Sequence, residues 1–139
     1  MCKNLKKLMA QSSHCIAALE DLKQCEEHDH DQVRRYALDA AQAEAEVFVA
    51  QKKAGVPGQD LAITLVSQAS CLVDASRIKE AIAVFNRASQ CAETKKFKDW
   101  IAEEVKSILE NVRDIPDKER EETLARFALD GMGPQRVEN

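Results

Sequence analysis

The chain has 139 residues, of which 45% are apolar and 32% are charged, and its formal net charge is −4. This composition excludes a disordered chain and a membrane-embedded one, and the length fits one domain with a core of its own. The negative charge disfavours a general nucleic-acid binder, and no apolar stretch approaches the ~20 residues that cross a membrane.

Six amphipathic segments follow one another, and none has the alternation of a β-strand. Four glycines and three prolines are too few for a turn-rich β fold. We expect a single all-α domain over residues 1–130 and a flexible C-terminal tail over 131–139. The expected helices span residues 3–25, 31–54, 60–73, 77–93, 96–113 and 117–129. Short turns make such helices antiparallel hairpins, which either close as a bundle or stack as a solenoid.

The first expected helix has a seam of small or apolar residues three and four positions apart. Its members are Leu5, Leu8, Ser12, Cys15, Leu19 and Leu22. This spacing predicts that the leucines bury against another helix, in the same chain or in a second copy. In the stretch SSHC (12–15), neighbouring side chains point about 100° apart, which is poor geometry for a Cys–His nucleophile. We interpret Cys15 as a core thiol.

The stretch CEEHDHD (25–31) follows this helix and holds residue types that bind transition metals. Cys25, His28 and His30 are the candidate ligands, but their spacing matches no established pattern and no second ligand cluster lies elsewhere. The alternative is a polar joint between two helices, with Asp29 as the cap of the second helix and Gln32 three residues on. We favour the joint and keep the metal site as the alternative.

The second expected helix places six residues on one face, where small alanines let a neighbouring helix approach closely. These residues are Tyr36, Ala40, Ala43, Val47, Ala50 and Ala54, and Phe48 lies to one side and widens the stripe. The sequence AGVPGQ (54–59) ends the helix, because Gly55 suits the left-handed position after a helix and Pro57 cannot continue one.

The third and fourth expected helices form the hairpin with the clearest apolar stripes. The inward residues of the third are Leu61, Leu65, Ala69, Leu72 and Val73, and those of the fourth are Ile78, Ala81, Ile82, Phe85, Ala88, Ser89 and Ala92. Between them DAS (74–76) makes a turn, and either Asp74 or Ser76 can cap the fourth helix.

Residues 62–93 resemble one tetratricopeptide repeat, a family whose pattern of 34 residues describes a helical hairpin. The matching positions are Leu65, Ala69, Leu72, Ile78, Ala81, Phe85 and Ala88, and KEAIAVFNRAS (79–89) is similar to the second helix of such a repeat. Gln68 and Glu93 depart from the pattern, and no second copy lies 34 residues away on either side. The resemblance implies a right-handed solenoid that binds a peptide or a protein, without catalytic residues.

The fifth and sixth expected helices are more highly charged. The fifth turns Phe97, Ile101, Val105, Ile108 and Val112 inward, with Trp100 at the edge of this stripe. Its first turn lies in TKKFKDW (94–100), where three lysines surround two aromatic side chains. Such a mixture can bind phosphates, but we favour a solvated flank around a core phenylalanine. The sixth has Leu124, Phe127 and Ala128 as its apolar side, and we interpret DKEREE (117–122) as a solvated face.

No group of acids, bases and nucleophiles in the sequence indicates catalysis. The five cysteines form no C-x-x-C pair, and we interpret them as reduced thiols of a cytoplasmic protein. The function we expect is a non-enzymatic helical scaffold, without a cofactor, that binds a protein or peptide partner. A homodimer through the N-terminal helix is a second expected interaction. The alternative is a small helical bundle that binds a metal or ligand through Cys25, His28 and His30.

Overall fold

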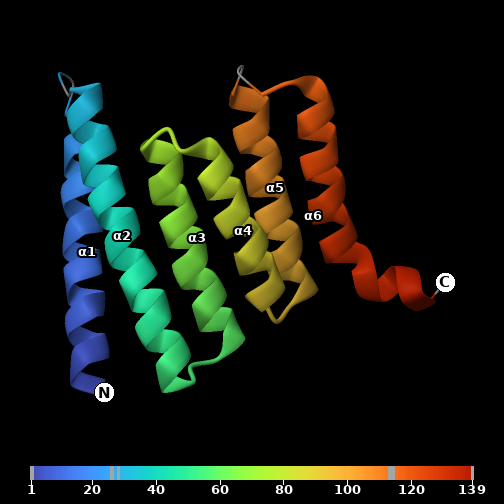
Figure 1. Ribbon diagram of the computed structural model, residues 1–139, viewed down its shortest axis with the longest axis horizontal. Coiled ribbons are helices and arrows are strands. Elements are labelled where there is room, and N and C mark those ends of the chain that lie inside the picture. The colour runs from blue at the N-terminus through green and yellow to red at the C-terminus, as the bar shows by residue number, and fades with distance from the viewer. Residues whose placement is uncertain (1, 26, 28, 113–114, 139) are drawn as a thin grey trace.

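Six α-helices follow one another along the described residues, and each packs against the next. The computed structural model describes residues 2–25, 27, 29–112 and 115–138, with side chains over 4–25, 27, 29–112 and 115–127. The helices are α1 (Cys2–Gln24), α2 (His30–Ala54), α3 (Gly58–Asp74), α4 (Ile78–Cys91), α5 (Lys95–Asn111) and α6 (Asp117–Glu138). They lie side by side in chain order and alternate in direction (Figure 1), so the expected all-α fold of antiparallel hairpins is confirmed.

Local signals account for most helix ends. Asp29 caps α2, and its carboxylate accepts a hydrogen bond from the backbone N–H of Asp31 at 2.9 Å. Gly55 ends α2 in the left-handed conformation, with φ of 73°, and its N–H reaches back to the last turn of the helix. Thr94 caps α5 by accepting a hydrogen bond from the N–H of Phe97 at 3.1 Å.

The expected side-chain cap of α4 is wrong. Arg77 occupies the capping position, and its side chain makes no capping hydrogen bond to the backbone of α4. Asp74 instead stays in the last turn of α3 and pairs with Lys23 of α1 at 3.0 Å. Ser76 takes a left-handed conformation, with φ of 64°, in the turn between α3 and α4. The two residues expected as caps therefore have other roles: Ser76 forms the tight turn, and Asp74 forms the ion pair with Lys23.

Buried apolar side chains form one continuous cluster from Leu19 in α1 to Phe127 in α6. Alanines at the helix contacts are fully buried: Ala37, Ala40, Ala62, Ala69, Ala81 and Ala88. Because an alanine adds only a methyl group, it lets two helix backbones approach closely. Phe85, Leu65 and Ile101 fill the space between the helices and are almost completely buried. Burial of each such side chain contributes about 1.5–3 kcal/mol.

The buried face of α2 is rotated from the expected one. Tyr36 is 38% exposed and Ala54 is exposed, whereas Ala37, which lay outside the expected stripe, is buried; Phe48 is buried as expected. The complete buried set is Ala37, Ala40, Ala41, Glu44, Val47, Phe48 and Gln51. α2 packs between α1 and α3, so its buried stripe is wide and includes two polar residues. The expected stripe did not include these two polar residues, and its centre is therefore displaced from that of the buried face.

α6 runs past its expected end at Leu129 and continues through GMGPQ to Glu138. The expected tail over 131–139 is thus helical in its described part. The end of α6 turns away from the direction of its first part (Figure 1). Pro134 and the two nearby glycines explain the bend, since proline removes a backbone donor and glycine weakens a helix.

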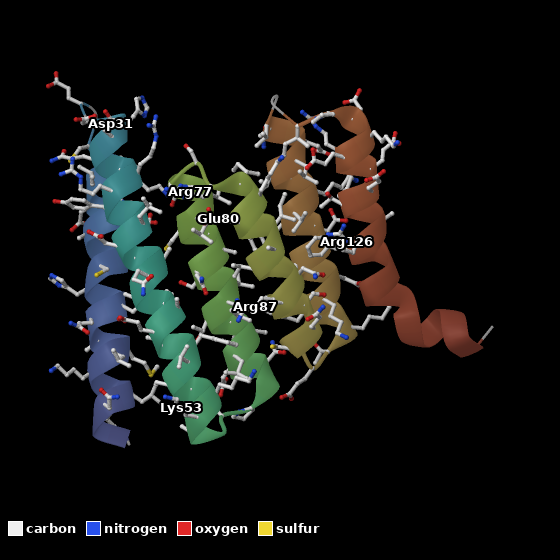
Figure 2. The ribbon with its side chains drawn as sticks, viewed as in Figure 1. Asp31, Lys53, Arg77, Glu80, Arg87 and Arg126 are labelled. Atoms are coloured by element: carbon white, nitrogen blue, oxygen red, sulfur yellow. The ribbon has the colours of Figure 1, made fainter. Side chains whose placement is uncertain are left out.

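The outer surfaces of the helices are charged. Asp31, Lys53, Arg77 and Glu80 are exposed, and the last two form an ion pair of 3.1 Å (Figure 2). Within the described residues, no helix is both long enough and apolar enough to cross a membrane.

Candidate functional site

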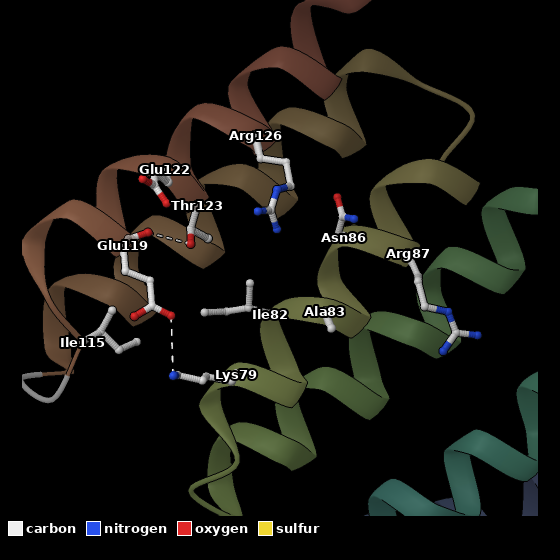
Figure 3. Close-up of a pocket in the computed structure, with 10 residues that line it drawn as sticks. All are labelled: Lys79, Ile82, Ala83, Asn86, Arg87, Ile115, Glu119, Glu122, Thr123 and Arg126. Atoms are coloured by element: carbon white, nitrogen blue, oxygen red, sulfur yellow. Dashed lines mark hydrogen bonds and ion pairs between the residues drawn. The ribbon is translucent and has the colours of Figure 1, made fainter.

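A cleft of about 490 Å³ opens between α4 and α6 (Figure 3). Its lining residues recur every three or four positions along each helix, so one face of α4 meets one face of α6. α4 contributes Lys79, Ile82, Ala83, Asn86 and Arg87; the residues around α6 are Ile115, Glu119, Glu122, Thr123 and Arg126.

One end of the cleft is closed by an ion pair. Lys79 of α4 lies 3.6 Å from Glu119 of α6, and both side chains are largely solvent-exposed. An exposed pair of this kind contributes little to stability, typically about 0–1 kcal/mol. Ile82 and the buried Ile115 supply the apolar part of the wall at this end.

Polar groups without a protein partner lie further along the cleft. The Asn86 side-chain oxygen is buried and receives no hydrogen bond from any described residue. Arg126 reaches from α6 into the space between the helices (Figure 3), and it makes no ion pair within residues 4–25, 27, 29–112 and 115–127. A buried acceptor without a donor costs about 1–3 kcal/mol, which an incoming N–H group would recover.

Two further contacts involve residues that line the cleft. The Thr123 hydroxyl donates to the Glu119 carbonyl at 2.8 Å, so this buried polar group is satisfied within α6. The Arg87 guanidinium lies 5.0 Å from the centre of the Phe48 ring and ties α4 to α2. The cleft thus presents a buried acceptor, the Asn86 oxygen, and a guanidinium donor, Arg126, without partners among the described residues.

The described residues of the stretch CEEHDHD follow the end of α1 and run into the first turn of α2, where the polar-joint interpretation expects them. Cys25 is exposed, and its thiol donates to the Asp21 carbonyl at 3.4 Å. His30 begins α2, and His28 lies outside the described residues. Among the residues that the structure describes, no three His, Cys, Asp or Glu side chains are close enough to hold a metal ion.

Two residues of SSHC face a small hollow between α1 and α2. His14 and Cys15 line it together with Tyr36 and Asp39, and its volume is about 210 Å³. Cys15 is half-buried and packs against the core cluster, in agreement with its interpretation as a core thiol. Sequence reasoning did not place Tyr36 and Asp39 beside it, because this requires the register between the two helices.

Cys71 is the most deeply buried of the cysteines with described side chains. Burial raises the pKa of its thiol to about 12, and the negative charge of Glu44 acts in the same direction. Cys71 is therefore a structural side chain and not a nucleophile at neutral pH.

The cleft itself was not anticipated from the sequence. Glu119 and Glu122 belong to DKEREE, which we interpreted as a solvated face, and Ile82 was assigned to the core. Glu119, Glu122 and Arg126 recur at helical spacing and therefore share one face of α6. The neighbouring sequence does not indicate that this face meets α4.

Comparisons with protein-family models, with curated proteins and with solved structures find no match to this chain.

Proposed function

We propose that this chain is a non-enzymatic scaffold that binds a peptide segment of a partner protein in the cleft between α4 and α6. The observation that carries the proposal is the buried Asn86 oxygen, which lies in an open cleft without a donor. An extended peptide supplies N–H groups at regular intervals, and one of them would satisfy this oxygen.

The charges of the cleft support the same proposal. Arg126 offers a planar donor for a carboxylate or a carbonyl of the peptide, and Glu122 on the same wall offers an acceptor for a basic side chain. The side chains in the cleft include no cysteine, histidine or serine, and the hydroxyl of its threonine, Thr123, already donates within α6. Binding, rather than a covalent reaction, fits these groups.

The proposal extends to the class and location of the protein. The tetratricopeptide-like stretch 62–93 coincides with the hairpin of α3 and α4, and in that family such hairpins bind peptides or proteins. Cys15, Cys71 and Cys91 form no disulfide, in keeping with a cytoplasmic protein.

The test is affinity capture from a lysate of the native host, followed by binding measurements with the partner that is recovered in stoichiometric amount. Arg126→Glu reverses a charge in the cleft, and Ala83→Arg fills the cleft from the exposed side of α4. We expect each substitution to weaken binding about tenfold or more, because both act where the peptide would lie.

Arg35→Glu is the matched control. Arg35 is exposed on α2, makes no ion pair with any described residue, and undergoes the same change in charge. The proposal predicts unchanged binding for this variant. Equal binding by wild type, Arg126→Glu and Ala83→Arg would place the partner elsewhere, and the absence of any stoichiometric partner would argue against a scaffold.

A further inference from the structure

The α6 wall of the cleft carries two opposite charges without a protein partner. Glu122 and Arg126 both line the cleft, and both side chains are exposed. Although they lie one turn apart, neither forms an ion pair within residues 4–25, 27, 29–112 and 115–127. Lys118, which is exposed one turn before Glu122, does not pair with it either. We call Glu122 and Arg126 the unpaired charges of the cleft.

The other charged side chains of the cleft already have contacts. Lys79 and Glu119 pair with each other at 3.6 Å. The Arg87 guanidinium lies 5.0 Å from the centre of the Phe48 ring, and its side chain points away from α6 (Figure 3). Within the described residues, the unpaired charges are therefore the charged groups of the lining that are left to contact a ligand.

The spacing of the unpaired charges matches the repeat of an extended peptide. Glu122 and Arg126 are four residues apart on α6, which corresponds to about 6 Å along the helix axis. On one face of an extended peptide, side chains two positions apart are about 6.6 Å from each other. Asn86, whose buried side-chain oxygen has no donor, lies on α4 across the cleft from Arg126 (Figure 3). One extended peptide can therefore place a side chain against each unpaired charge and an N–H group beside Asn86.

The helices that form the cleft are joined to their neighbours by bonds in which the unpaired charges take no part. Arg120 of α6 donates through its Nε to the Ile115 carbonyl at 2.9 Å and also donates to the Val112 carbonyl, so the start of α6 is tied to the end of α5. Reciprocal hydrogen bonds between Gln59 and Glu93, each at 3.1 Å, tie the turn after α4 to the start of α3. Substitution of the unpaired charges leaves both sets of bonds intact.

We propose that the peptide bound in the cleft carries a basic and an acidic residue two positions apart, the basic one against Glu122 and the acidic one against Arg126. The charge pattern rests on the proposed function, since it describes the peptide that the cleft binds. A peptide whose charges have a single sign would meet a like charge at one of the two positions, so the cleft disfavours it. Either sequence order meets the pattern, because a peptide can lie in the cleft in either direction.

The test selects binders from a displayed library of random heptapeptides, on the full chain and on the variant Ala83→Arg, which fills the cleft. Peptides recovered on the wild type but not on Ala83→Arg depend on the cleft. We expect these peptides to contain a lysine or arginine two positions from an aspartate or glutamate far more often than the unselected library does. In synthetic copies measured by calorimetry, alanine in place of either charged residue should weaken binding about fivefold.

Charge reversal at Arg126 should change which peptide the cleft prefers. Arg126→Glu should bind a copy in which lysine replaces the acidic residue more tightly than the original peptide, because the charge that this residue meets is reversed. Arg126→Lys keeps the charge and should keep the wild-type preference. The matched control is Arg35→Glu, which makes the same change in net charge at an exposed position on α2 and should also keep it. Circular dichroism confirms that all variants are folded.

Failure of the charge pattern is distinguishable from failure of the peptide site itself. Cleft-dependent peptides that lack the paired charges, or that carry opposite charges four positions apart as on a helix, would overturn the charge pattern and leave the peptide site standing. An unchanged preference in Arg126→Glu would do the same. Recovery of the same peptides on the wild type and on Ala83→Arg, or of no peptide at all, would contradict both.

Discussion

At the scale of single residues, burial separates the cysteines by reactivity. Cys25 is exposed, whereas Cys71 is buried beside Glu44 and its pKa is raised to about 12. Burial disfavours the thiolate, so the Cys71 thiol stays protonated at pH 8. Since the thiolate is the reactive form, the position of a cysteine in this fold decides its chemistry.

We therefore expect iodoacetamide to modify Cys25 within minutes at pH 8 and to leave Cys71 unmodified in the native protein. Mass spectrometry of the digested protein reads both sites. In concentrated urea the two cysteines should react at similar rates, which provides the control. Rapid modification of Cys71 in the folded chain would show that the segment around α3 opens readily.

At the scale of elements, pairs of polar side chains join neighbouring helices. Ser12 of α1 donates a hydrogen bond to the carboxylate of Glu44 in α2, and both residues are buried. Thr64 of α3 donates to the Gln51 side chain of α2 at 2.7 Å. These pairs explain why α2 buries two polar residues at its contacts with α1 and α3.

Removal of one member of such a pair should lower the free energy of unfolding. Ser12→Ala should lower the free energy of unfolding by about 1–3 kcal/mol, because the buried Glu44 carboxylate loses its donor. Adding Glu44→Met should restore part of this loss, since no buried charge remains. Urea denaturation measures both effects.

Ser13→Ala is the control for this pair. Ser13 is exposed next to Ser12 on α1, so its removal should change the free energy of unfolding by less than about 0.5 kcal/mol. Equal effects of the two serine substitutions would mean that the contact with Glu44 adds nothing to stability.

At the scale of the whole molecule, the hairpins form a row with α1 and α6 at its two ends (Figure 1). Leu19 is buried against the rest of the chain, but Leu5, Leu8 and Leu22 are only half-buried, and Met9 is 46% exposed. The intrachain burial that the seam predicted is thus complete for Leu19 and partial for the other leucines. The homodimer through α1 stays a prediction.

Light scattering over a wide range of concentration tests this dimer. If α1 pairs with its copy, the mass should approach that of two chains at high concentration, because the half-buried leucines would be covered. Met9→Glu should return the mass to that of one chain. A constant mass of one chain for the wild-type protein would remove the dimer.

The sequence by itself determined the helices and most of their ends. The signals for Asp29, Gly55 and the turn at Pro57 involve only residues within a few positions of one another, and the apolar stripes of α3, α4 and α5 depend only on the helical repeat. Leu65, Phe85 and Ile101 were placed correctly in the core for this reason.

Only the tertiary structure decided which faces meet. The rotated face of α2, the cleft that joins Asn86 to Arg126, and the reciprocal bonds between Gln59 and Glu93 each depend on the register of helices distant in sequence. That register results from many weak packing contacts summed over whole helix faces. No short stretch of the chain contains this sum, so the cleft between α4 and α6 forms only when the helices are packed together.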